Sequence, residues 1–268
     1  MGYPFVNTII KRRSVDLPIT RLKSLSTSGS RSEILEALSR FGIQNSDMSL
    51  SEANLTLGNF FRLRLGSLSN RLRGTPFLFM LTKRFDILQL IDFITNFTES
   101  RVAVKLVSRL SPINFERVTD LNSLINEINR LYRFNINPNY KAGDARDELL
   151  RQYLARLAQM SGHSSRSLIN KERFLLNLPH RADYLHFLSE HKNDWFYRFF
   201  NGNSSFWDIK AIFYLYNTAK KASIEDPLGE LVPLYYTYYM DLTYKFAKAL
   251  YFSIKENIKL DFEEAWET

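Results

Sequence analysis

The sequence predicts an all-α protein, and three observations favour this class. Apolar residues recur every three or four positions through long stretches of the chain, which is the period of an amphipathic helix. No stretch alternates apolar and polar residues ahead of a hairpin turn, as a half-buried strand would. The 268 residues are 45% apolar and 24% charged, which is the composition of a folded protein rather than a disordered one.

The first helices are predicted from residue 17 onward. Apolar residues at 17, 19, 22 and 25 begin a helical pattern, and a weaker pattern covers 31–41. From Ser51, with Glu52 in the first turn, an apolar stripe runs through Leu57, Phe61 and Leu65 to an expected end near Gly74.

Pro76 opens the next predicted helix, which runs to about Phe97. This helix is apolar on most of its circumference, so we expect it to be central. Phe85, Leu88, Ile91 and Phe93 are its expected core residues.

Weaker helical patterns cover 120–133, 144–160 and 180–190, and a long helix with a 3.6-residue period begins at Leu231. Glycine, proline, asparagine and serine gather at 26–30, 43–51, 135–143, 161–167 and 201–205, where we expect loops. None of these loops is long enough for an interdomain linker. The sequence therefore predicts a single elongated helical body over 1–268, with possible repeats at approximately 1–100, 101–200 and 201–268.

The net charge of +8 lies wholly in the N-terminal third. Residues 1–84 hold 13 Lys and Arg against 5 Asp and Glu, whereas the other 184 residues hold 23 of each kind. Such a distribution is typical of a surface that meets nucleic acid, anionic lipid or an acidic protein, but a solvated helical face would have the same composition. The first 31 residues, rich in Ser and Arg, also have the composition of an organellar transit peptide.

Motifs for catalysis and cofactor binding are absent from the sequence. With no cysteine, zinc fingers, iron–sulfur clusters and thiol nucleophiles are excluded. The four histidines form no HExxH pair, and no phosphate-binding glycine loop occurs. The acids Asp144, Asp147 and Glu148 lie in a polar stretch where nothing raises a pKa, so we interpret them as solvated. We expect no catalytic residue, cofactor or metal.

Tyrosines at 235, 236, 238 and 239 could stack on bases, but their helical spacing within an apolar stripe favours a place in the core. Two pairs of segments also resemble each other. Residues 32–41 and 122–131 share their apolar positions and an arginine, and Phe85-Asp86-Ile87-Leu88 resembles Trp207-Asp208-Ile209-Lys210. These matches indicate a repeated helical module without regular spacing.

Three segments together resemble the C-type coupling subunit of the A/V-type rotary ATPases, which is called subunit d in the vacuolar enzyme. The opening residues 3–13 combine an aromatic, a hydrophobic and an Asn residue with a short basic helix. The segment 81–90 is similar to the R-x-D-hydrophobic-x-N-L helix start of that family, with Gln89 where Asn is usual. Asp226-Pro227-Leu228-Gly229 ahead of a long helix resembles its last repeat, although Asp241 is the one acid that remains on that helix.

This resemblance implies a funnel of three similar helical bundles. Such a protein lies on the cytoplasmic side of the membrane proteolipid ring of a proton- or sodium-translocating ATPase, as a peripheral subunit, and receives the central stalk. It would couple ring and stalk without catalysis. The expected partner-binding residues are Lys11, Arg12, Arg13, Arg62, Arg64, Arg71 and Arg73. The expected structural residues are Asp86, Asp208 and Asp241, the first two as carboxylates near helix starts.

The alternative is a helical nucleic-acid-binding protein of organellar or ribosome-associated type. It explains the basic N-terminal third and the many aromatic residues. An enzyme is the third possibility, and no motif favours it.

Overall fold

The computed structural model describes residues 7–10, 19–69, 75–95, 113, 118–177 and 207–258. Helix is the only regular secondary structure within these residues, so the predicted all-α class is confirmed. The predicted helix at 180–190 and the predicted loop at 201–205 lie outside the described residues.

Three helices form the N-terminal part of the fold: α2 (Ile19–Ser28), α3 (Arg31–Ser39) and α4 (Leu50–Ser69). The predicted loop at 26–30 is shorter than expected, because α2 continues to Ser28. Ser30 then caps α3: its hydroxyl accepts from the Glu33 backbone N–H while the Glu33 carboxylate accepts from the Ser30 backbone N–H. This reciprocal pair of contacts satisfies two donors that a helix start otherwise leaves unbonded.

The single helix predicted from Pro76 to Phe97 is wrong in one respect, since two helices occupy that stretch. α5 spans Pro76–Thr82 and α6 spans Arg84–Thr95, with Lys83 in a turn between them. The Lys83 backbone N–H bonds to carbonyls of the preceding turn at Met80 and Leu81, which tightens the end of α5. The break directs Arg84, the first residue of α6, into the protein interior.

The burial of α6 also differs from the expected pattern at two positions. Phe85 and Phe93 are buried as predicted, whereas Leu88 and Ile91 are only partly buried against the core. We therefore expect Leu88→Ala to raise the free energy of folding by about 1–2 kcal/mol, below the ~2–5 kcal/mol typical of a fully buried leucine. Urea unfolding of this variant beside Leu90→Ala, at a buried position of the same helix, measures the difference. Equal losses would contradict the partial burial of Leu88.

The middle of the chain forms α8 (Leu121–Tyr132), α9 (Ala142–Met160) and α10 (His163–Asn177). The loop predicted at 161–167 is wrong, because only Ser161 and Gly162 separate α9 from α10. Serine is a weak helix former that also favours helix ends, so the run of serines after His163 gave a loop signal although it forms the first turns of a helix.

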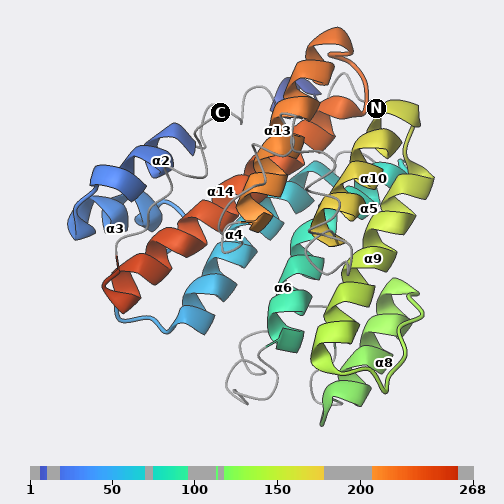
Figure 1. Ribbon diagram of the computed structural model, residues 1–268, viewed down its shortest axis with the longest axis horizontal. Helices are drawn as coiled ribbons and strands as arrows, with labels where there is room; N and C mark the ends of the chain where they lie inside the picture. The colour runs from blue at the N-terminus through green and yellow to red at the C-terminus, as the bar shows by residue number, and fades with distance from the viewer. Residues whose placement is uncertain are drawn as a thin grey trace, which may run out of the picture.

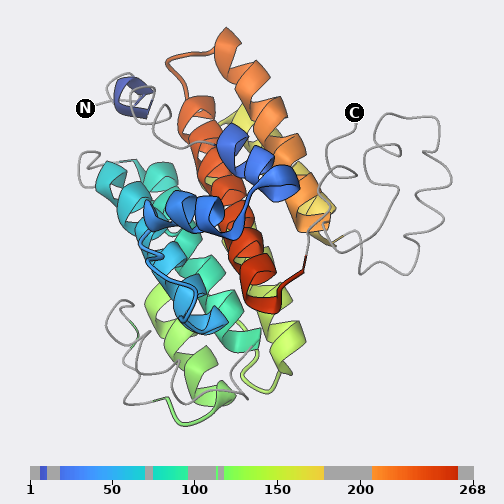
Figure 2. The ribbon, with the colours of Figure 1, turned by 90° about the vertical axis from the view of Figure 1, so that its left-hand side faces the viewer.

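α13 (Trp207–Glu225) and α14 (Leu231–Glu256) complete the described fold. α14 is the central element, packed against α2, α3, α4, α5, α10 and α13. Figures 1 and 2 show this helix running through the molecule with α2 and α3 on one side and α13 beside it. Tyr236, Tyr238 and Tyr239 are buried, which confirms the core interpretation for these three tyrosines. Tyr235 is only partly buried and stacks on Tyr216.

The two similar segments 32–41 and 122–131 both form capped helices. At α8, Asp120 takes the place of Ser30, and its carboxylate accepts from the Ser123 backbone N–H. The two helices lie in different surroundings, since α3 packs against α2 and α14 while α8 lies at the far end of the molecule beside α9 (Figure 1). The shared pattern thus indicates a common local helix start.

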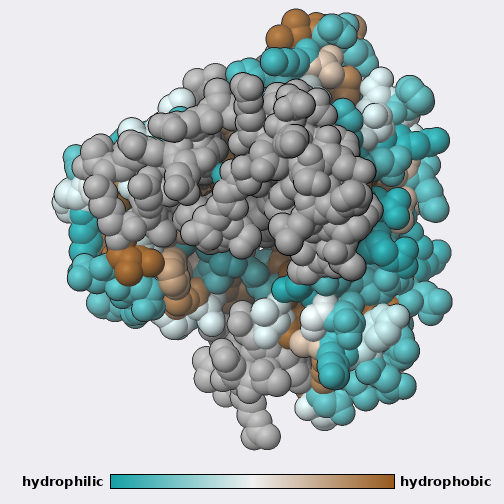
Figure 3. All heavy atoms as spheres, viewed as in Figure 1, coloured by the Kyte–Doolittle hydropathy of each residue, from teal (hydrophilic) through white to brown (hydrophobic). Residues whose placement is uncertain are grey.

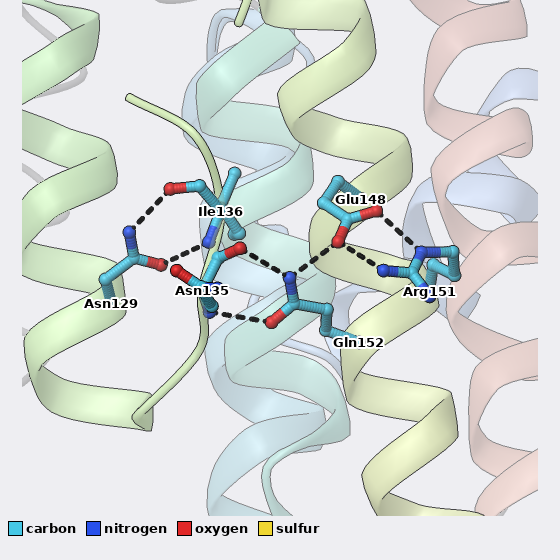
Figure 4. A network of polar contacts seen from close by, with 6 residues as sticks. All are labelled: Asn129, Asn135, Ile136, Glu148, Arg151 and Gln152. Carbon is cyan, nitrogen blue, oxygen red and sulfur yellow. Dashed lines mark hydrogen bonds and ion pairs between the residues drawn. The ribbon is translucent and has the colours of Figure 1, made fainter. Parts of the chain in front are cut away.

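Side-chain amides hold the loop between α8 and α9 in place, as Figure 4 shows. Asn129 accepts from the Ile136 backbone N–H and donates to its carbonyl, at 2.9 and 2.7 Å. Gln152 makes the same paired contact with Asn135, at 2.8 and 2.9 Å. Each side-chain amide bonds to a backbone N–H and a backbone carbonyl of the loop, as a neighbouring strand would in a sheet. The loop is therefore held against both helices.

On the face that Figure 3 shows, the described residues that are visible are largely polar, with scattered apolar ones. Apolar atoms gather at the tip where α13 turns into α14, where Ile224 and Leu228 are 74% and 60% exposed. None of the helices in the described part of the chain has the length and apolar character that crossing a bilayer requires.

Candidate functional site: a buried charge cluster and a basic groove

A cluster of charged side chains lies in the interior where α6, α10 and α14 meet. The Arg84 guanidinium donates to Glu172 at 2.6 Å and to Asp241 at 2.5 and 3.0 Å. The side chains of these three residues are at most 3% exposed. The cluster therefore ties together helices from three distant parts of the sequence.

Two tyrosines complete the surroundings of the cluster. Tyr238 donates its hydroxyl to Glu172 at 2.9 Å, and Arg84 lies over the Tyr238 ring, 5.5 Å from its centre. Tyr153 is buried beside the cluster. Burial raises the pKa of both tyrosines above their ordinary value, and the neighbouring Glu172 raises both further.

The electrostatics of the cluster keep Arg84 charged. Burial on its own would lower the pKa of Arg84, but the carboxylates of Glu172 and Asp241 raise it well above its ordinary value. The Asp241 oxygen Oδ1 accepts no hydrogen bond within the described residues. Because the cluster is closed to solvent, its geometry suits a structural cross-link between helices better than acid–base chemistry.

The sequence pattern predicted a structural role for Asp241, but it did not indicate Arg84 as the partner of Asp241 and gave no signal that was used for Glu172. A signal for Glu172 exists, because it lies at helical spacing from Leu168, Ile169 and Leu175 and so interrupts an apolar stripe with an acid. A carboxylate on the buried face of a helix needs a cationic partner elsewhere in the chain.

Asp86 lies in the first turn of α6, as its place near a helix start predicted. Its carboxylate is 3.2 Å from the Lys83 ammonium and 3.8 Å from Arg62 Nε. These described contacts are with cationic side chains, which adds charge pairing to the favourable interaction with the helix dipole. Asp208 lies in the first turn of α13, and its side chain is outside the described residues.

The predicted partner-binding arginines divide into two groups. Arg62 and Arg64 on α4 are partly buried, where Arg62 faces Asp86 and Arg64 Nε donates to the Tyr236 hydroxyl at 3.2 Å. Part of the basic charge of the N-terminal third is thus directed toward other helices of the same chain. Lys11, Arg12, Arg13, Arg71 and Arg73 lie outside the described residues, and their role stays a prediction.

The N-terminal residues contact the turn between α13 and α14. Asn7 is buried, and its side-chain amide donates to the carbonyls of Pro227 and Gly229 at 3.0 and 3.2 Å. This amide therefore holds the turn in place, although Asn7 and Pro227 are 220 residues apart in the sequence.

A groove of about 560 Å³ opens between α5 and the ends of α8 and α9. Its apolar lining consists of Pro76, Phe79, Met80, Leu131, Tyr132 and Met160. Its cationic lining consists of Lys83, Arg133 and Arg156. We call this feature the basic groove, and no motif in the sequence indicated it, because its residues come from three separate helices.

Within the described residues no group of His, Asp and Glu is arranged to hold a metal ion. Glu148, interpreted from sequence as solvated, instead accepts from Arg151 and Gln152, and hydrogen bonding by Arg151 lowers its pKa.

Comparison of the chain with protein-family models, curated proteins and solved structures found no match.

Proposed function

We propose that the protein is a non-catalytic coupling subunit of an A/V-type rotary ATPase, similar in role to the C-type subunit of that family, which links the proteolipid ring to the central stalk. It would associate peripherally with the cytoplasmic face of the membrane, as part of a complex that translocates protons or sodium ions. The proposal includes the arrangement of the helices as a funnel of three similar bundles.

One observation carries the proposal: the segments that resemble the family contact one another in pairs. Asn7 of the opening segment bonds to the Asp-Pro-Leu-Gly turn at Pro227 and Gly229. Arg84 of the Arg-x-Asp segment bonds to Asp241, the one acid that the last helix shares with the family pattern. Motifs that lie far apart in the sequence therefore form two tertiary contacts, which supports a common structural origin for them.

The mechanical demands of coupling also agree with the described fold. A subunit that transmits torque must be stiff, and the central α14 packs against six other helices and is fixed to α6 by a buried ion pair. It also needs surface for several partners. The tip with exposed Ile224 and Leu228 offers an apolar contact of this kind.

Purification of a tagged chain from its native membranes tests the proposal. We expect the chain to bring down proteolipid and central-stalk subunits of a rotary ATPase, and the isolated chain to hydrolyse no ATP. A ribonuclease-treated sample serves as the control for indirect capture. Recovery of RNA or ribosomal proteins without any rotary ATPase subunit would refute the coupling function.

Nucleic-acid binding is the second candidate because aromatic and cationic side chains line the basic groove together, Phe79 and Tyr132 with Lys83 and Arg133. Such a combination suits single-stranded nucleic acid. RNA affinity that falls steeply and linearly with the logarithm of salt concentration would favour this function over coupling.

A further inference from the structure

The basic groove exposes apolar side chains at its rim. Phe79 on α5 is 59% exposed and Met160 at the end of α9 is 39% exposed, although both line the groove. A small ligand lying within the groove would leave much of these two side chains in water. A larger partner that lies along the groove would cover both the floor and the rim.

The charge of the groove selects an acidic partner. All three of its charged lining residues, Lys83, Arg133 and Arg156, are cations, and no carboxylate lines it among the described residues. Lys83 has a counter-ion in Asp86, but Asp86 is shared with Arg62. Arg156 donates only to backbone carbonyls, at Tyr132 and Arg133, which leaves its charge without a described carboxylate.

The backbone around the groove favours a helical partner over an extended one. An extended peptide needs backbone donors and acceptors to pair with, as at a sheet edge. The groove lies between helices, and the carbonyls at the end of α8, those of Tyr132 and Arg133, already accept from Arg156. A partner segment that satisfies its own backbone, as a helix does, fits such a site.

The groove wall is fixed before any partner arrives. Arg133 ends α8 in the left-handed conformation, with φ of 56°, and the loop that follows is held by Asn129 and Gln152. Arg156 also lies over the Phe134 ring, 5.4 Å from its centre. A preformed site loses little conformational entropy on binding.

We propose that the basic groove docks an acidic amphipathic helix of a partner protein, whose apolar side chains pack on Phe79 and Met160 and whose carboxylates meet Lys83, Arg133 and Arg156. The proposal rests on the groove alone and holds whether or not the partner belongs to a rotary ATPase.

Two synthetic probe peptides of about 18 residues test this proposal, each with the same Leu and Phe face and with either Glu or Lys on the polar face. Fluorescence anisotropy with the full chain should detect binding of the Glu peptide and none of the Lys peptide. Arg133→Glu should weaken binding of the Glu peptide about tenfold or more, because it reverses a charge at the site. Phe79→Ala should weaken it through the lost apolar contact.

Both substitutions fall on exposed side chains, so circular dichroism should show an unchanged fold. Arg31→Glu and Leu63→Ala, at exposed positions outside the groove lining, are the matched controls and should leave affinity unchanged. Equal binding of the two peptides, or equal losses in Arg31→Glu and Arg133→Glu, would overturn the proposal. So would binding of phosphatidylglycerol vesicles or RNA that Arg133→Glu abolishes while the Glu peptide fails to bind.

Discussion

Arg84→Met is expected to destabilise the folded protein by about 3–5 kcal/mol, because it leaves two buried carboxylates without their counter-ion. Glu172 and Asp241 both bond to Arg84, and neither carboxylate is more than 1% exposed. Water cannot replace the lost guanidinium without opening the packing of α6, α10 and α14. Urea unfolding followed by circular dichroism measures the loss.

A second variant separates two effects on stability: that of leaving the two carboxylates unpaired and that of losing the Arg84 side chain itself. In Arg84→Met/Glu172→Gln/Asp241→Leu the unpaired charges are gone, and the amide introduced in place of the Glu172 carboxylate can still accept from Tyr238. Replacing a whole buried ion cluster in this way is often neutral or stabilising, and Asp241 Oδ1 lacks a hydrogen bond within the described residues to begin with. We therefore expect the triple variant to recover most of the stability.

The exposed pair of Arg21 with Glu36 provides the comparison, since the two side chains are 39% and 68% exposed and their pairing should contribute little. Arg21→Met should leave the unfolding midpoint unchanged. If Arg84→Met did the same, the cluster would be accessible to water and its structural role would be wrong.

Alkaline pH is expected to unfold the protein through its buried tyrosines. Burial raises the pKa of Tyr153, Tyr238 and Tyr244 above the ordinary value near 10, and Asp92 raises that of Tyr244 further. Below pH 10 these phenols are protonated in both states, and stability is fully present. Above pH 10 the unfolded chain loses protons that the folded chain keeps, so stability falls with pH by about 1.4 kcal/mol per unit for each tyrosine, or roughly 4 kcal/mol per unit for three.

Urea midpoints measured between pH 8 and pH 11, together with the absorbance of tyrosinate, provide the test. Tyr153→Phe should lower the slope of stability against pH by the contribution of one tyrosine, about 1.4 kcal/mol per pH unit. Tyr140→Phe, at a 39% exposed side chain, should leave the slope unchanged. A rise in tyrosinate absorbance before unfolding that Tyr153→Phe reduces would show that the Tyr153 phenol is accessible to solvent.

Periodicity was sufficient to predict the helices with a clear apolar stripe. α4 and α14 begin within one residue of their expected starts, and the weaker pattern at 144–160 lies close to the bounds of α9. α10 went unpredicted because its first turns are polar and Glu172 lies on its buried face. The break at Lys83 was missed because both halves of that stretch are apolar, and the chain direction is set by tertiary packing of Arg84.

The candidate site was less predictable than the fold. Asp86 and Asp241 could be singled out as acids on apolar helices, but their partners depend on how helices pack. The contact between Arg84 and Asp241 joins residues 157 positions apart, and local pattern carries no information about such a pair. The basic groove combines three helices in the same way, so its charge could not be read from any one segment.

The central place of α14 has a consequence for protein synthesis. Among the described helices α14 is the last to leave the ribosome, yet α2, α3, α4, α5, α10 and α13 all bury surface against it. Until it emerges, those helices lack their common partner, and Arg84 and Glu172 lack Asp241. The nascent chain thus exposes the apolar faces of its earlier helices through most of translation, a period in which binding by chaperones would protect it from aggregation.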